Sequence, residues 1–350
     1  MLLGLAACGP HYDDDTSLRN LSGQQPIYDG ETTHVVGRHL TQSDGSQVLS
    51  WPGSAVSTRF TGNGVTASLK LLEGQKQTFF NVVLDGNDLG PLTVDTNSTL
   101  YTVQADGDGP HDLTLVKMNE AMDSVVAFGG FTPASGALQP TARPTGRRLL
   151  LIGDSITCGY GNLGVITTQA LTSSQSSDAN SLRDCNYFLG KQVYQVSNAY
   201  QAYGTQAARH LQAEWQLVSW SGKGVYRNAD GTQSETMADI WQRAVATDGN
   251  TQYAPADFVP QAVVINLGTN DFGSIAESQN PGGGPPSIPT FKARYLTILR
   301  GVRKAFPSAW IFVATGPMLS DYYPTTFKAL STMRTTLADL IDTMGDHRVR

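Results

Sequence analysis

Three positions in the second half of the chain carry groups that suit acyl transfer. Ser155 follows a continuous apolar run, residues 149–152, and a Gly-Asp turn pair. A serine held on a tight turn just beyond a buried strand is well placed to act as a nucleophile. Gly222 and Asn270 follow two further apolar runs in the same way. The sequence therefore predicts one site built from three strand ends.

Acyl transfer needs a nucleophile, a general base and hydrogen-bond donors for the negatively charged oxygen of the intermediate. Ser155 is the candidate nucleophile, and its own backbone N–H, at the start of a helix, can serve as one donor. Gly222 offers a second backbone N–H that no side chain shields, and Asn270 offers a side-chain NH₂ without adding negative charge. Each pattern alone is typical of a turn or helix cap, but the ordered set indicates one active site. Asp154 and Asp271 are interpreted as turn and cap formers.

The elements that must position these residues alternate between strands and helices. Apolar strand patterns cover residues 149–152, 215–219, 262–267 and 310–314, and helical periodicity covers residues 198–213, 290–306 and 325–344. This alternation predicts parallel βαβ units. The carboxyl ends of parallel strands lie at one edge of a sheet, so the three motifs are expected to meet there.

The first half of the chain has a different pattern. Residues 27–134 contain short alternating or β-branched runs separated by Gly, Asn and Asp turn signals, and residues 140–146 form a Pro/Gly/Arg linker. The predicted fold class is therefore two domains. Residues 26–140 are expected to form a β-sandwich (jelly roll), and residues 147–350 a three-layer α/β domain with a parallel sheet.

Composition excludes several other functions. The formal net charge is −6 and no basic cluster occurs, which argues against nucleic acid or an anionic membrane surface as a partner. No Cys/His cluster has metal-ligand spacing, and no glycine-rich phosphate loop occurs. Neither a metal nor a cofactor is predicted, and no stretch is long enough to span a bilayer as a helix.

The N-terminus resembles the end of a bacterial lipoprotein signal. Residues 5–8, Leu-Ala-Ala-Cys, match a lipobox, and residues 1–25 as a whole are interpreted as signal and tether, although an ordinary apolar N-terminus is the alternative. We therefore expect an extracellular or cell-envelope protein that meets the membrane only through lipid on Cys8. The remaining cysteines, Cys158 and Cys185, could form one disulfide or stay unpaired.

The motifs Gly153-Asp154-Ser155, Gly222 and Gly268-Thr269-Asn270-Asp271 resemble those of the SGNH or GDSL hydrolase superfamily. The stretch 218–228 and the preceding β-type half make the chain more similar still to carbohydrate esterase family 2. The resemblance implies removal of O-acetyl groups from plant-wall polysaccharide such as xylan or glucomannan. It also assigns the nucleophile role to Ser155 and oxyanion-binding roles to the Ser155 N–H, Gly222 and Asn270.

The family's catalytic histidine belongs to an Asp-x-x-His block that the chain does not show. His347 is the only late histidine, and it directly follows Asp346. It precedes a short strand pattern, residues 348–350, which puts it at the amino end of that strand, the wrong edge for the site. We therefore expect the general base to lie beyond Arg350 in an incomplete domain, and these 350 residues alone to have little esterase activity.

Two other functions stay open from the sequence. One is a lipase or thioesterase of the same superfamily, acting on acyl esters instead of glycans. The other is a non-catalytic carbohydrate-binding protein that uses aromatic side chains of the β-type half, such as Trp51, Phe79 or Tyr101, although most of these are expected in the core.

Overall fold

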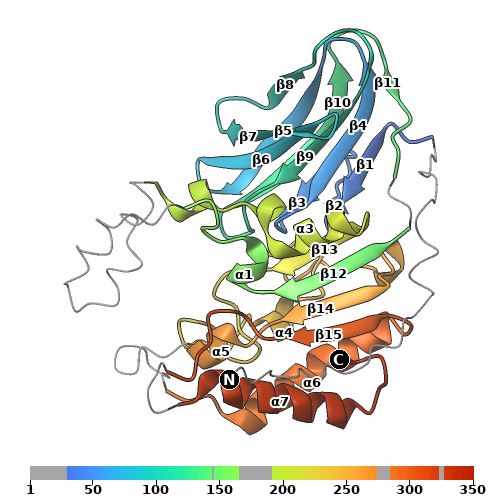
Figure 1. Cartoon of the computed structure of the whole chain (residues 1–350). Coiled ribbons are helices and arrows are strands. Elements are labelled where there is room, and N and C mark those ends of the chain that lie inside the picture. Colours follow the sequence, from blue (N-terminus) through green and yellow to red (C-terminus); the bar gives the residue numbers. More distant parts are fainter. Residues whose placement is uncertain (1–29, 144–145, 165–190, 274–283, 323–326) are drawn as a thin grey trace, which may run out of the picture.

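The computed structural model describes residues 30–143, 146–164, 191–273, 284–322 and 327–350. A β domain and an α/β domain follow one another along the chain (Figure 1). The predicted fold class is confirmed by two antiparallel sheets and one parallel sheet. Cys8 and Cys185 lie outside the described residues, so the lipid anchor and the disulfide stay predictions.

The β domain consists of two facing antiparallel sheets (Figure 1). The first sheet has the order β1-β4-β9-β6-β7, with β11 beside β4, and the second has the order β2-β3-β10-β5-β8. The strands of the first sheet are β1 (Thr33–Val36), β4 (Ala55–Thr61), β9 (Pro110–Lys117), β6 (Gln77–Leu84), β7 (Asn87–Asp95) and β11 (Leu138–Gln139). Those of the second are β2 (His39–Thr41), β3 (Gln47–Leu49), β10 (Ser124–Pro133), β5 (Gly64–Gly74) and β8 (Leu100–Gln104).

Alternating burial explains why these segments form a sandwich. In β4, Val56, Thr58 and Phe60 are buried while the residues between them are half-buried. A period of two places every second side chain on the inner face of a sheet. The inner faces of both sheets form one apolar core that includes Phe60, Leu69, Phe80 and Phe128. Burial of these large side chains holds the two sheets together.

The α/β domain is built on a parallel sheet with the order β13-β12-β14-β15. Its strands are β12 (Arg148–Gly153), β13 (Glu214–Ser219), β14 (Ala262–Asn266) and β15 (Trp310–Ala314). Its α-helices are α1 (Ser155–Cys158), α3 (Tyr203–His210), α4 (Met237–Ile240), α5 (Thr269–Gly273), α6 (Ile288–Ala305) and α7 (Ala329–Met344), with short 3₁₀ turns η4 (Val193–Val196), η5 (Ala199–Gln201) and η6 (Pro255–Asp257). None of the helices in the described ranges is long and apolar enough to cross a membrane.

Both faces of the parallel sheet are covered, which explains its continuous apolar strands. Leu149 and Leu151 of β12 pack in a cluster with Ala208 of α3. Leu150 and Ile152 point to the opposite face and share a cluster with apolar residues of α6 and α7. Figure 1 shows α6 and α7 side by side below the sheet. The apolar residues of α6 recur every three or four positions, as a helix with one buried face requires.

The helix expected over residues 198–213 is divided in the structure. The turn η5 is followed by Ala202 in extended conformation, and α3 begins only after it. The Ala199 N–H donates to the Met118 carbonyl of the β domain at 3.0 Å. This contact with another domain fixes η5 in place, and helical periodicity in the sequence carries no sign of it.

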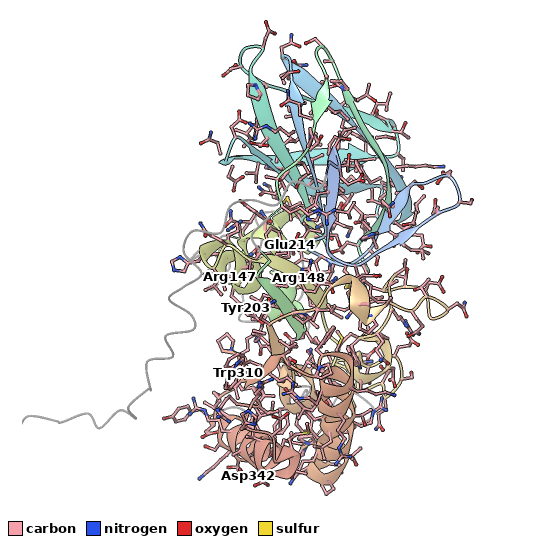
Figure 2. The ribbon with its side chains drawn as sticks, turned by 90° about the vertical axis from the view of Figure 1, so that its right-hand side faces the viewer. Arg147, Arg148, Tyr203, Glu214, Trp310 and Asp342 are labelled. Carbon is pink, nitrogen blue, oxygen red and sulfur yellow. The ribbon has the colours of Figure 1, made fainter. Side chains whose placement is uncertain are left out.

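Buried polar contacts join the two domains. Arg38 of the β domain is 2% exposed, and its Nη1 donates to the carbonyls of Trp241 and Arg243. His34 lies 2.5 Å from Glu214 at the start of β13, and Arg148 Nε donates to the same carboxylate at 3.3 Å. Figure 2 shows Arg148 and Glu214 close together at this junction. Buried charged side chains of the β domain are therefore paired with polar groups of the α/β domain.

A buried carboxylate at this interface predicts a specific pH dependence of stability. Burial, followed by the charge of Asp123, raises the pKa of Glu120 to about 7 from its ordinary value of 4.5. The folded state therefore favours the protonated form, and the free energy of unfolding should fall as the pH rises from about 4.5 to about 7, by at most about 1.4 kcal/mol per pH unit for this group. Glu120→Gln should flatten that slope in urea unfolding at pH 5 and pH 7. An identical slope in both proteins would contradict this prediction.

Candidate active site

The ends of the parallel strands are aligned in one row. Gly153 of β12 pairs with Ser219 of β13 on one side and with Asn266 of β14 on the other. Asn266 in turn pairs with Ala314, the last residue of β15. Because the strands end together, the segments that follow them leave the sheet at the same edge. This register brings the motifs around Ser155, Gly222 and Asn270 together.

Ser155 is held by a tight turn at the start of α1. Gly153 cannot carry a side chain, because a Cβ there would lie 1.9 Å from Thr157 Oγ1. Asp154 caps the helix, since its Oδ1 accepts the Ile156 N–H at 3.0 Å. Burial raises the pKa of Asp154 to about 6. The interpretation of Asp154 as a turn and cap former agrees with this geometry.

The loop after β13 presents Gly222. Its φ of 78° lies in the left-handed region, which favours glycine. Its carbonyl accepts the Ala229 N–H at 2.8 Å, which closes the loop. Within the described part of the chain, the N–H groups of Gly222 and Ser155 donate to no protein atom. Both N–H groups are therefore available to a bound oxygen.

Asn270 lies in α5 and contacts the Gly222 loop directly. Its Nδ2 donates to the Lys223 carbonyl at 2.8 Å. A carboxamide nitrogen carries two hydrogens, so one fixes the side chain while the other stays available for an oxyanion.

Asp271 holds the continuation of the same loop. Its carboxylate oxygens accept the backbone N–H groups of Val225 at 2.7 Å, Tyr226 at 2.9 Å and Arg227 at 3.0 Å. Burial raises the pKa of Asp271 to about 6, and the three backbone donors act against that shift. Gly224 is required in this loop because a Cβ would lie 1.9 Å from the Arg227 carbonyl. Asp271 is therefore a loop former, as interpreted from the sequence.

Ser155, Gly222 and Asn270 all line one open cavity of about 700 Å³. Much of the remaining lining is polar and comes from the loop after Gly222, namely Lys223, Asn228, Asp230, Thr232, Ser234 and Glu235. Aromatic or apolar groups are contributed by Met122, Tyr160, Val193 and Trp220. The three predicted site residues are thus brought to a single cleft, whose lining combines polar side chains with aromatic and apolar ones.

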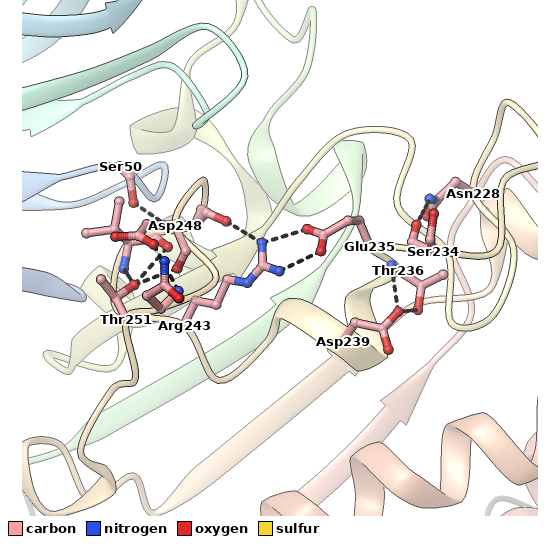
Figure 3. Close-up of polar contacts among 12 residues, drawn as sticks. Ser50, Asn228, Ser234, Glu235, Thr236, Asp239, Arg243, Asp248 and Thr251 are labelled. Carbon is pink, nitrogen blue, oxygen red and sulfur yellow. Dashed lines mark hydrogen bonds and ion pairs between the residues drawn. The ribbon is translucent and has the colours of Figure 1, made fainter.

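The outer wall of the cavity is fixed by its own hydrogen bonds (Figure 3). Asn228 Nδ2 donates to the Ser234 carbonyl at 2.9 Å. The guanidinium of Arg243 contacts both carboxylate oxygens of Glu235 at 2.7 Å. This two-point contact holds Glu235, and with it the end of the loop, in place.

Among the described residues, no histidine lines this cavity. His347 is exposed and lies two residues before Val349, which pairs with Ile311 near the amino end of β15. His347 is therefore at the opposite edge of the sheet from Ser155, as the sequence predicted. His210 is exposed in the last turn of α3, and His34 and His111 pair with Glu214 and Asp85.

Two residues near the cleft were missed by sequence reasoning. Met122 lines the cavity, and Glu120 contacts the residue that precedes Gly222. Both belong to the connection between β9 and β10 in the β domain. No catalytic motif marks this connection, and it lies outside the parallel strands whose ends form the site, so the sequence alone offered no signal for it.

Comparison with known families agrees with this arrangement. Residues 151–349 match the model of the GDSL-like lipase/acylhydrolase family. The chain belongs to this family. Residues 35–141 match the carbohydrate esterase 2 N-terminal model, so this GDSL-family chain carries the β domain typical of family 2 carbohydrate esterases. The resemblance inferred from the sequence is confirmed.

Several relatives and solved structures are similar to this GDSL-family chain. Cellulase/esterase CelE of Acetivibrio thermocellus is 32% identical over 297 residues, which is 85% of this chain and 32% of that protein. An acetylxylan esterase/glucomannan deacetylase of Cellvibrio japonicus is 29% identical, over 68% of this chain and 61% of its own length. The chain thus spans less than two thirds of these two relatives. The structure of a family two carbohydrate esterase from Clostridium thermocellum in complex with cellohexaose has a TM-score of 0.72 and 29% identity, covering 91% of this chain and 86% of that one.

Proposed function

We propose that the protein is a serine esterase that removes O-acetyl groups from plant cell-wall polysaccharide. The observation that carries the proposal is the convergence of a hydroxyl, two backbone N–H groups and a carboxamide on one open cavity. Ser155, Gly222 and Asn270 supply these groups from three different strand ends. This set can form and stabilise the tetrahedral intermediate of acyl transfer.

The reaction proceeds in two steps on Ser155. Its Oγ attacks the acetyl carbonyl carbon, the ester bond to the sugar breaks, and the sugar hydroxyl leaves with a proton while the acetyl group stays on the serine. Water then attacks the acyl-enzyme and releases acetate. In both steps the carbonyl oxygen becomes negatively charged, and the N–H groups of Ser155 and Gly222 and the Asn270 NH₂ donate to it. The Ser155 proton passes to a general base.

The lining of the cavity favours a glycan over a long acyl chain. Hydroxyl and charged side chains such as Lys223, Asp230 and Ser234 can exchange hydrogen bonds with sugar hydroxyls. Tyr160 and Trp220 offer aromatic surface against which an apolar sugar face can pack. A medium-chain acyl group would instead need an apolar channel, because burial of its methylenes supplies its binding energy.

The relatives support the same substrate class. One is named an acetylxylan esterase/glucomannan deacetylase, and a family two esterase similar to this chain binds cellohexaose. Among the aromatic residues suggested for a purely glycan-binding role, Trp51 is fully buried and so offers no surface to a ligand.

Acetate release by the complete gene product tests the proposal. We expect at least about tenfold higher kcat/KM on acetylated xylan or glucomannan oligosaccharides than on an octanoyl ester, because the polar side chains of the cleft can hydrogen-bond to sugar hydroxyls but not to an alkyl chain. Faster turnover of the octanoyl ester would favour a lipase or thioesterase. Binding of the acetylated oligosaccharide with no acetate release would favour a carbohydrate-binding protein.

A further inference from the structure

A carboxylate from the β domain reaches the loop that carries Gly222. Glu120 is 3% exposed, and its Oε2 accepts the Ser221 N–H at 2.5 Å. Its Oε1 also accepts the Ser221 hydroxyl. One carboxylate therefore binds both donors of the residue immediately before Gly222. Two contacts made by one side chain to the same residue fix the orientation of that residue as well as its position.

Fixing Ser221 also fixes the donor of Gly222. The Gly222 N–H lies in the planar peptide group that follows Ser221, so only rotation about the Ser221 Cα–C bond separates it from the Cα that these contacts hold. On the far side, the Lys223 carbonyl accepts Asn270 Nδ2 at 2.8 Å. The Gly222 N–H is thus held between a contact from the β domain and a contact from α5.

Glu120 contacts the nucleophile's helix as well. The thiol of Cys158, the last residue of α1, lies 3.6 Å from Glu120 Oε2. Ser155 is the first residue of that helix. The same carboxylate therefore touches the elements that carry the nucleophile and one oxyanion donor, and relates their positions to each other.

The connection that bears Glu120 is itself fixed. Lys117 is fully buried, and its Nζ donates to the carbonyls of Asn119 at 2.6 Å, Glu120 at 3.3 Å and Ser50 at 3.2 Å. The Ser124 N–H also donates to the Glu120 carbonyl at 3.1 Å. A rigid support of this kind is what a positioning residue needs, because small displacements of a donor weaken transition-state stabilisation strongly.

We propose that Glu120 is a positioning residue for the oxyanion hole, acting through Ser221 on the Gly222 N–H. The β domain then completes the esterase site in addition to any contact it makes with glycan. This inference rests on the proposed function for its kinetic part. Its structural part, the restraint of the Ser221–Gly222 backbone, can be measured without catalysis.

The kinetic test compares Glu120→Gln with Glu73→Gln in the complete gene product. Glu73 is a matched control, because it is another β-domain carboxylate that reaches the α/β domain, at Thr247, but far along the chain from the Gly222 loop. We expect E120Q to lower kcat about 10- to 100-fold with KM changed less than twofold, since the oxyanion donor is needed in the transition state and not for binding. E73Q should retain the wild-type kcat. A fall in kcat together with a large rise in KM, or no change in either, would overturn the proposal.

A double-mutant cycle separates positioning from general stability. Ser221→Ala removes the hydroxyl contact and should lower kcat about three- to tenfold. In the double variant S221A/E120Q, the loss should be no larger than in E120Q alone, because both changes act through the same contact. If the fold-losses in kcat of the two single variants multiply in the double variant, Glu120 acts on the reaction independently of Ser221. If E120Q does not fold, S221A still decides the matter, since wild-type kcat in S221A would contradict the proposal.

Amide hydrogen exchange of the full-length protein gives the readout that does not need activity. In E120Q, the peptide containing residues 219–224 should exchange at least about tenfold faster, while peptides from β12 and β14 exchange as in the wild type. Unchanged exchange in that peptide, or faster exchange throughout the domain, would refute the restraint. If the wild-type gene product releases no acetate, the proposed function fails, and hydrogen exchange still decides whether Glu120 holds the loop.

Discussion

Replacement of Ser155 by alanine is expected to lower kcat for acetate release by at least about 10⁴-fold. The change removes the hydroxyl that we propose forms the acyl-enzyme, while the oxyanion donors and the cleft stay in place. Ser155 is the first residue of α1, and the cap of that helix comes from Asp154, so the fold should be preserved. The measurement is acetate release from acetylated xylan by the complete gene product, with the melting temperature as a check on folding.

Ser98→Ala is a suitable control for this prediction. Ser98 is an exposed serine in the β domain, outside the cavity, so the variant should keep wild-type turnover. If S155A kept more than about one hundredth of the wild-type kcat, the nucleophile would have to be another group.

Asn270→Ala is expected to lower kcat about 10²- to 10³-fold, equivalent to about 3–4 kcal/mol of transition-state stabilisation. The substitution removes one of three proposed oxyanion donors. It also leaves the Lys223 carbonyl without the Nδ2 donor that now holds it at 2.8 Å. Because the oxyanion exists only in the intermediate and its flanking transition states, KM should change little.

A second substitution at Asn270 distinguishes the loss of a hydrogen-bond donor from the addition of a negative charge. Asn270→Asp keeps the size of the side chain but replaces the NH₂ donor by an oxygen, so it should be at least as damaging as alanine. Asn97→Ala, at an exposed turn of the β domain, serves as the control and should have wild-type kcat. Activity of N270A within threefold of wild type would show that Asn270 only shapes the loop.

The types of element and their order could be read from local residue patterns. The run 149–152 is apolar at every position because β12 is covered on both faces, and this pattern arises only in a buried strand or helix segment. The residues at which a helix or strand begins and ends are harder to predict from such patterns. The helix expected from residue 198 begins at Tyr203, because a hydrogen bond from Ala199 to Met118 of the other domain holds the preceding turn.

The positions of the three site residues could also be predicted, because they depend on where strands end. Ser155, Gly222 and Asn270 each follow a strand, and parallel strands place their carboxyl ends at one edge. Topology therefore brings them together without any knowledge of side-chain contacts. The position of His347 at the other edge follows from the same rule, since it precedes the segment that pairs with β15.

The sequence by itself determined the two kinds of domain and the three strand-end motifs, because these depend on periodicity and turn chemistry within a few residues. Only the tertiary structure decided how the Gly222 loop is held. The three backbone bonds to Asp271 and the contact between Glu120 and Ser221 join residues that are 44 to 46 and 101 positions apart. Such contacts depend on the packing of one domain or loop against another, and local residue patterns do not encode that packing.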